Sequence, residues 1–503
     1  MLKKFFVFFL FLFLFDFLFF EKLQFLLPNE SPWNSNHFFN FLYEFQLAVQ
    51  KPKKAKRVIV VGSSIAYFSI QKSLLEKTLS QEISEPVEVE YLSYAGKSPL
   101  YVYLMRKKLL ELKPDLVVYP INFIDYRLHR GFVLFGGNPQ SSWDENLLLR
   151  DAVTKEEAPQ SFYIFPFETI LEFSKILSLE HISSYVLARI FSFYRFRDIW
   201  FENVQNLFQH RFGKNNRYHS YMGVPIPERV STLGWTGEKF SFRVLEAHTK
   251  EGFLVEVPNE VLKTGNFQIS FFCPKTSESF TWSTSSSGWQ KVLLPVSMKD
   301  CFVSATLSDT FEPRNATGVL FDYNKMKLGV RLQQTFGLEK PLQNRMYERE
   351  ERLEDLGYAS MSDPEYDEYF YYRLLSDPEK RPGIAYLVAL MKTKKLLNQE
   401  KFQDLFHFRY LKKLSLFLDD QKIPFLLINN PENPISLEWY EKSPWYQSHL
   451  EFLRSLQSNN TQFVDLKNSL RRQDFTDFHH FTYSGMEKMN PIYVKEIRKV
   501  WEK

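Results

Sequence analysis

An unbroken apolar run near residue 60 constrains the fold of this chain most strongly. Residues 57–64 read RVIVVGSS, with β-branched residues at successive positions and a Gly-Ser-Ser turn at the end. A strand with one face in water alternates apolar and polar residues, whereas a strand covered on both faces is apolar throughout. The run therefore predicts a buried parallel strand that ends in a tight turn at Ser64.

The segments around this run alternate between strand and helix patterns. A helix is expected from about residue 65 to 79, a strand over 87–96, an amphipathic helix over 100–112 and a strand over 115–121. The pattern returns near the C-terminus with strands over 424–431 and 461–467 and a final helix over 486–502. Such alternation is typical of an α/β domain with a parallel sheet.

Between these parts the periodicity changes to two. Short segments from about residue 239 to 332, such as KFSFRVL and FQISFFC, alternate apolar and polar positions. Short alternating strands at close spacing favour a β-sandwich inserted into the α/β domain. The only two cysteines, Cys273 and Cys301, both lie in this insert. They form either a disulfide or two buried thiols, and the sequence leaves both open.

The N-terminus predicts a membrane anchor. Lys3 and Lys4 precede a Phe/Leu-rich run over residues 5–20, and apolar residues resume up to Leu27. About 20 apolar residues span a bilayer, and the preceding lysines favour a cytoplasmic N-terminus. No cleavage site follows, so we expect an uncleaved single-pass anchor with the bulk of the chain extracytoplasmic, that is, periplasmic. Asp16, within the run, either pairs with a membrane partner or lies near the outer interface.

Together these patterns give a domain map. It consists of a transmembrane signal-anchor over 1–27, a juxtamembrane helix and linker over 28–56, a first α/β part over 57–227, the sandwich over 228–335, a helical segment over 336–400 and a second α/β part over 401–503. The net charge of +4 is too small for a nucleic-acid-binding face. No Cys/His cluster is present, so no metal site is expected.

Polar residues follow the predicted strands at the edge where ligands bind in open α/β sheets. Ser64 follows the first strand, and Asp477 and His480 lie three residues apart before the last helix. A serine nucleophile needs a base within hydrogen-bond reach and an acid that orients that base. The three residues therefore form a candidate catalytic triad, against the alternative that the serine and the histidines, His479 included, are ordinary loop residues.

These residues resemble the SGNH/GDSL hydrolase superfamily. Its Gly-Asp-Ser block is similar to VVGSS, with Ser64 as nucleophile, and its last block, D-x-x-H-[LF]-[TS]-x-x-G, matches residues 477–485, DFHHFTYSG. The resemblance implies a flavodoxin-like parallel sheet with helices on both faces, no cofactor, and oxyanion donors at Ser64 and Gly96. The third block departs from the family pattern: Asn122 stands two residues early, Ile124 occupies its place, and Asn122 is a further candidate donor.

The Gly-Ser-Ser turn resembles a membrane-anchored branch of that superfamily. It includes the D-alanine transfer protein of teichoic acids and alginate O-acetyltransferase-like proteins. This similarity implies an envelope polysaccharide or acyl-glycan as substrate and a membrane-bound acyltransferase as a candidate partner. The segment SSSGWQKVLLPV resembles a strand of carbohydrate-binding modules, against the alternative of a core tryptophan in any sandwich.

The predicted function is acyl transfer on a cell-envelope glycan through an ester on Ser64. Two alternatives remain open. One is plain hydrolysis by an SGNH carbohydrate esterase or lipase, because transfer and hydrolysis share the triad and differ in water access and acceptor binding. The other is a non-catalytic envelope assembly protein that retains the fold.

Overall fold

The structure is a computed structural model. It describes the following residues: 2–22, 37–94, 96–126, 146, 149–150, 153–154, 159–201, 230, 234–262, 265–311, 327–333, 358–359, 361–367, 370, 406–442 and 444–502. Of the predicted helical segment 336–400, all but residues 358–359, 361–367 and 370 lie outside this description, as do residues 202–227 of the first α/β part.

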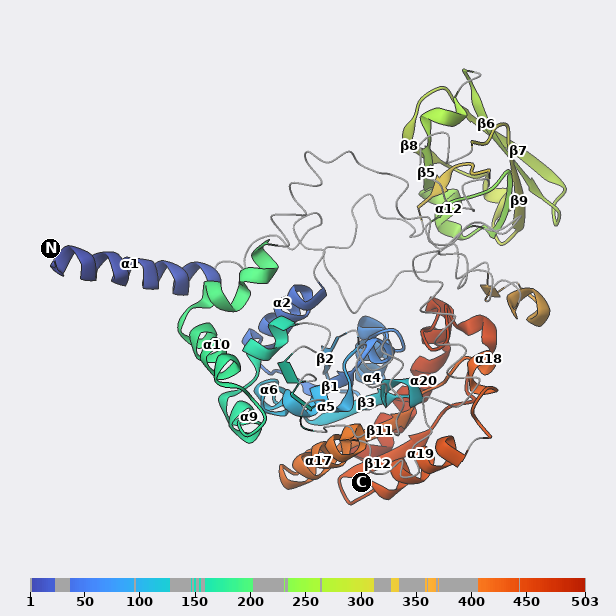
Figure 1. Ribbon diagram of the computed structural model, residues 1–503. Helices are drawn as coiled ribbons and strands as arrows, with labels where there is room; N and C mark the ends of the chain where they lie inside the picture. The colour runs from blue at the N-terminus through green and yellow to red at the C-terminus, as the bar shows by residue number, and fades with distance from the viewer. Residues whose placement is uncertain are drawn as a thin grey trace.

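A five-stranded sheet forms the centre of the α/β domain (Figure 1). Its strands are β1 (Lys56–Gly62), β2 (Val87–Ser93), β3 (Leu116–Ile121), β11 (Phe425–Asn429) and β12 (Thr461–Asp465). They lie in the order β2-β1-β3-β11-β12, and every neighbouring pair is parallel. The predicted α/β class with a parallel sheet is confirmed. The order reverses direction between β1 and β3, the point at which such sheets bind ligands.

Helices cover both faces of this sheet. On β1, Val58 and Val60 belong to one core, whereas Ile59 and Val61 belong to the other. The first core is closed by α3 (Ser64–Tyr67), α4 (Lys72–Ile83) and α20 (Tyr483–Trp501). The second is closed by α2 (His37–Gln50), α5 (Pro99–Leu104), α6 (Arg106–Glu111), α17 (Phe406–Asp420) and α19 (Pro444–Ser455). Burial on both faces explains the unbroken apolar run of β1.

Helix α2 lies within the expected juxtamembrane helix and linker over residues 28–56, but it packs into the α/β domain. Phe38, Phe41 and Phe45 recur at intervals of three and four residues, and all three are buried in the second core. Such spacing places side chains on one helix face. The α/β domain therefore includes residues from His37 onward, twenty residues before its predicted start.

Two predicted helices are each divided in the structure. The expected helix over residues 65–79 is α3 and α4, and the expected helix over 100–112 is α5 and α6. The second division lies at Met105, whose backbone leaves the helical region at φ −89° and ψ 1°. Apolar periodicity alone did not reveal these interruptions.

The N-terminal helix α1 runs from Leu2 to Glu21. The predicted membrane span is not found, since no helix among the described residues is both long enough and apolar enough to cross a bilayer. The 20 residues of α1 include Lys3, Lys4, Asp16 and Glu21, so the apolar run is interrupted or bounded by charge at both ends.

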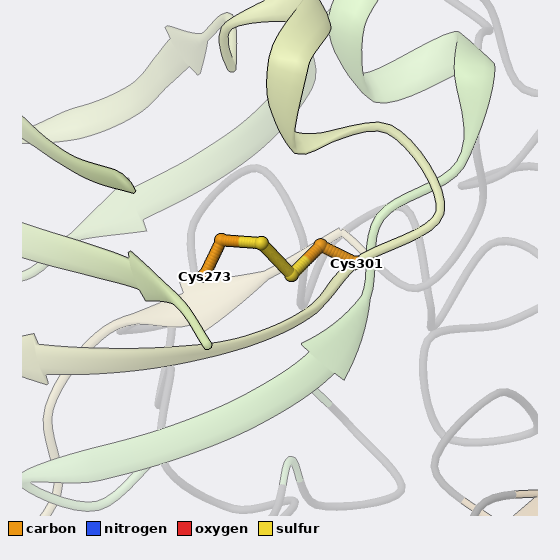
Figure 2. Close-up of a disulfide and its surroundings, with 2 residues drawn as sticks. All are labelled: Cys273 and Cys301. Atoms are coloured by element: carbon orange, nitrogen blue, oxygen red, sulfur yellow. A yellow bond between two sulfur atoms is a disulfide. The ribbon is translucent and has the colours of Figure 1, made fainter. Parts of the chain in front are cut away.

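The insert is a β-sandwich of two antiparallel sheets with a core of its own. One sheet has the order β4-β9-β6-β7 and the other β10-β5-β8. Cys273, at the end of β6, is bonded to Cys301, so the structure has a disulfide rather than two free thiols (Figure 2). The strands are β4 (Lys239–Arg243), β5 (Phe253–Val257), β6 (Phe267–Cys273), β7 (Glu278–Thr284), β8 (Gly288–Val292), β9 (Phe302–Leu307) and β10 (Arg331–Leu332).

The remaining described elements are short apart from α10. They are α9 (Phe167–Glu172), α10 (Leu179–Ile190), α12 (Glu246–Lys250), α18 (Pro434–Leu437), a helix over residues 192–201, and the 3-10 helices η2 (Phe123–Tyr126), η3 (Pro159–Ile164), η4 (Asn259–Val261), η5 (Val296–Met298) and η9 (Arg472–Asp474).

Candidate active site

Ser64 lies at the carboxyl end of β1, where the chain turns into α3. Gly62 makes this turn with a φ of +132°, and a Cβ there would lie 2.9 Å from the Tyr119 ring, so only glycine fits. The preceding Ser63 is the N-cap of α3, and its Oγ accepts a hydrogen bond from the Ile65 N–H at 3.1 Å. Ser63 is thus used structurally, whereas the half-buried Ser64 presents its hydroxyl at the sheet edge.

His480 and Asp477 lie in a short loop between η9 and α20. Phe475 and Phe481 pair across the base of this loop, and the Thr476 N–H donates to the His480 carbonyl at 2.8 Å. Both oxygens of Asp477 are used. Oδ1 accepts the N–H groups of His479 and His480 at 3.0 and 2.9 Å, and Oδ2 lies 2.7 Å from His480 Nδ1.

The relay is completed by the other nitrogen of the same imidazole. His480 Nε2 lies 2.8 Å from Ser64 Oγ, so serine, imidazole and carboxylate are connected in sequence. Burial acts to raise the pKa of Asp477, but the adjacent His480 and His479 and their hydrogen bonds outweigh it and hold that pKa well below its usual range. An ionised Asp477 fixes a proton on Nδ1 and leaves Nε2 free to accept the serine proton.

The other matched residues of the D-x-x-H block support the loop. Thr482 is the N-cap of α20, and its hydroxyl accepts a hydrogen bond from the Gly485 N–H at 3.1 Å. A Cβ on Gly485 would lie 2.5 Å from the Asp474 carbonyl oxygen, so a larger residue would displace the loop from the helix. The threonine and glycine of the block therefore help to set the position of the loop that carries His480.

Asn433, which the sequence did not indicate as a site residue, holds the backbone of the loop that carries Asp477. The Asn433 amide donates to the Asp477 carbonyl at 2.9 Å and to the Tyr366 hydroxyl at 3.1 Å, and the Asn433 N–H donates to the Phe478 carbonyl at 3.1 Å. Tyr366 in turn donates to the Phe475 carbonyl at 2.7 Å. The sequence held a signal, because Asn followed by Pro434 is typical of a helix N-cap, and Asn433 caps α18.

The predicted oxyanion donors lie on the strands that flank β1. Gly96 follows β2 with a φ of +74°, and Asn122 follows β3 and is fully buried. The Asn122 N–H donates to Asp125 Oδ2 at 3.2 Å. Parallel strands place these residues at the same edge as Ser64, and their role toward an oxyanion remains a prediction because it depends on the position of a bound acyl group.

His479 shares the loop with His480. Its ring lies beside that of His480, with centroids 4.2 Å apart, and it is buried. Asp477, His479 and His480 are also the one group of acidic and histidine side chains in the described part of the chain with ligand atoms close enough, within 4.8 Å, to share a metal ion. A metal there would compete for the same Asp477 and His480 atoms that form the relay.

A second buried polar cluster lies at the carboxyl end of β11. Glu432 accepts hydrogen bonds from Tyr440 and from Tyr446, the latter at 3.3 Å. Burial raises the pKa of Glu432 to about 8, against the lowering effect of these hydrogen bonds, and the Asp125 charge adds to the increase. Glu432 is therefore mostly protonated at neutral pH, one residue from Asn433, which holds the Asp477 loop.

Comparison with known proteins identifies a family but no activity. A family model whose description names no activity matches residues 29–502. A protein from Leptospira interrogans serogroup Icterohaemorrhagiae serovar Lai (strain 56601), described as uncharacterized, is 49% identical over 492 residues, which are 97% of this chain and 92% of the relative. The chain therefore belongs to the family that this model defines and of which the Leptospira protein is a relative.

Proposed function

We propose that this protein is a serine acyltransferase that modifies a cell-envelope glycan through an acyl ester on Ser64. The observation that carries the proposal is the continuous relay from Ser64 Oγ through His480 to Asp477, with distances of 2.8 and 2.7 Å. Three groups at these distances and in this order form a base-activated nucleophile, whatever the surrounding fold.

The reaction has two balanced halves. Ser64 Oγ attacks the acyl carbonyl of the donor while His480 Nε2 takes the serine proton, and the proton then passes to the departing donor group. The acyl group remains as an ester on Ser64. A glycan hydroxyl next gives its proton to His480 and attacks this ester, and His480 returns the proton to Ser64 Oγ. Asp477 stabilises the imidazolium in both halves, and Ser64, Gly96 and Asn122 are the proposed oxyanion donors.

An SGNH-type fold is the finer assignment that we propose for the α/β domain. Its support is the strand order β2-β1-β3-β11-β12, the serine directly after β1, and the Asp-x-x-His loop directly before the last helix. The displacement of Asn122 from the family position is the feature that fits least well.

An envelope location and a glycan substrate fit three further features. The Cys273–Cys301 disulfide is typical of oxidising compartments outside the cytoplasm. Helix α1 offers an apolar element for membrane association. Trp289 on β8 is 47% exposed rather than buried in the sandwich core, which supports a sugar-stacking role over a packing role. A membrane-bound acyltransferase is the proposed source of the acyl group.

The cheapest test is labelling of the full-length protein with a fluorophosphonate probe, which reacts with activated serines. We expect labelling at Ser64, mapped by peptide mass, and its loss in Ser64→Ala and His480→Ala. Ser63→Ala is the matched control, because the Ser63 hydroxyl caps α3 and the variant should still label. A folded protein that never labels would favour the non-catalytic assembly role.

A second assay separates transfer from hydrolysis. The protein is given a chromogenic acetyl ester, with or without a soluble oligosaccharide. Acetylated sugar among the products supports the transferase, whereas free acetate alone, at a rate indifferent to the sugar, supports the esterase or lipase alternative.

A further inference from the structure

Helix α1 is fixed to the α/β domain through its only internal charge. Both oxygens of Asp16 accept backbone hydrogen bonds, from the Ser192 N–H at 2.6 Å and the Phe193 N–H at 2.7 Å. These are the first two residues of the helix over 192–201, where unpaired N–H groups and the helix dipole favour a carboxylate. Asp16 is consequently 8% exposed, and neither alternative derived from the sequence anticipated this internal contact.

Aromatic contacts extend the same junction. The Phe20 ring lies 5.0 Å from Phe193, and the Phe19 and Phe20 rings each lie 5.6 Å from Trp200. Together with Asp16 these contacts make α1 an attached element of the domain rather than a free tether. Figure 1 shows α1 and α10 on the same flank of the α/β domain.

Beyond this junction α1 is apolar on every side. All positions from Phe6 to Leu18 except Asp16 are large apolar residues that are 43–70% exposed. A groove on another protein would cover one face of such a helix and leave the others in water. A helix that is apolar all round is stable only where apolar groups surround it, and the acyl chains of a lipid bilayer are one such environment.

The neighbouring helices carry an exposed apolar stripe that continues from α1. Leu179 on α10 is 85% exposed. The next exposed apolar residues along α10 follow seven or eight positions later and then three or four positions after that, which places them on one face of the helix. The stripe crosses into the helix that Asp16 caps. Its members are Leu179, Val186, Leu187, Ile190, Phe191, Phe193 and Phe201, all of them exposed.

We propose that this stripe, which we call the lipid-facing stripe, lies in the interface of a bilayer beside α1. The α/β domain would then be seated on the membrane by two elements at a fixed orientation. The inference rests on the membrane association of α1 in the proposed function, but not on acyl transfer. Its partner is the lipid itself, because continuity with α1 through Asp16 places the stripe at the same surface.

The test uses the full-length protein with a single added cysteine, since both native cysteines are bonded. Leu187→Cys reports on the stripe, Leu10→Cys on α1, and Leu416→Cys, an exposed apolar position of α17, is the matched control. Each is labelled with an environment-sensitive fluorophore and bound to phosphatidylcholine/phosphatidylglycerol vesicles that contain acyl-chain quenchers. Ile190→Cys replaces Leu187→Cys if the latter does not fold.

We expect quenching and a blue shift at positions 10 and 187 and neither at 416. If the probe at position 10 is quenched but the probe at position 187 gives the same signal as the control at 416, the lipid-facing stripe is overturned and α1 alone contacts the membrane. No quenching at 10 overturns membrane association as a whole. In Asp16→Ala the quenching at 187 should fall while that at 10 persists, and an unchanged signal at 187 contradicts the coupling through Asp16.

Discussion

His480 Nε2 and Ser64 Oγ lie 2.8 Å apart although 416 residues separate them in the chain. If Ser64 and His480 act together as proposed, the effects of removing them should not be additive. We expect Ser64→Ala and His480→Ala each to abolish acyl-ester turnover and the double variant to be little worse than either. Initial rates with a chromogenic ester check this. Additive losses in the logarithm of the rate would mean that the residues act independently.

Asp477→Asn should retain a small residual rate, because the amide preserves the loop but favours the wrong imidazole tautomer. His479→Ala is the matched control in the same loop. It should keep most of the activity, since the imidazole nitrogen that lies 2.8 Å from Ser64 Oγ belongs to His480. An inactive His479→Ala together with an active His480→Ala would reverse the assignment.

Asn433→Ala should lower kcat more than it changes KM. The variant removes the donor to the Asp477 carbonyl and leaves buried acceptors unpaired, a cost of about 1–3 kcal/mol in a buried network. If this energy is lost from the arrangement of Asp477 and His480 in the transition state, kcat should fall roughly tenfold to hundredfold. Steady-state kinetics and the pH profile are the measurements. A variant that is less stable to denaturant yet keeps wild-type kcat would show that Asn433 has a structural role only.

Glu432 predicts a loss of stability as the pH rises. Its folded pKa of about 8 lies above the value of an unfolded glutamate, so the folded state binds more protons between the two. The contribution of Glu432 to the free energy of unfolding is then fully present below about pH 4.3 and is lost as the pH rises through 8, at a slope of up to about 1.4 kcal/mol per pH unit. Denaturant unfolding of wild type and Glu432→Gln checks this, because the amide should remove the slope.

The disulfide should stabilise the sandwich alone. Its cysteines are 28 residues apart, and the chain-entropy model gives roughly 3–4 kcal/mol for a loop of that size. Reduction of the full-length protein should move an unfolding transition of the β-rich part to lower denaturant. In the double variant Cys273→Ser/Cys301→Ser, added reductant should have no further effect. Loss of probe labelling at Ser64 on reduction would mean that the two units depend on each other.

The sheet and the Asp477–His480 pair could be predicted because they depend on local patterns, and Ser64 could be added because it follows a buried parallel strand. Burial on both faces makes β1 and β11 apolar throughout, and the D-x-x-H spacing alone brings Asp477 to His480. The composition of residues 28–56 predicts a juxtamembrane helix and linker, but not that helix α2 belongs to the α/β core. The aromatic face of α2 packs on the core at one face of the assembled sheet, and no pattern within residues 37–50 indicates that contact.

The missed parts of the site depend on tertiary contacts. Asn433 carries a cap signature, but nothing in the sequence indicates that its amide also reaches Asp477, 44 residues away. The contact of Asp16 could not be predicted either. A charge in an apolar run suggests an unfavourable position in a bilayer, whereas the structure pairs Asp16 with the N–H of Ser192, 176 residues later in the chain.

The insertion of the sandwich between β3 and β11 also has a consequence during biosynthesis. Ser64 is synthesised 416 residues before His480, which at about 5–20 residues per second means an interval of roughly 20–80 s. Both cysteines are made within this interval, so the sandwich can fold and oxidise while the nucleophile still has no base. Under the proposed mechanism, a chain cut short before His480 would therefore carry a serine without its base, and Ser64 would gain that base only after the loop with Asp477 and His480 has been made.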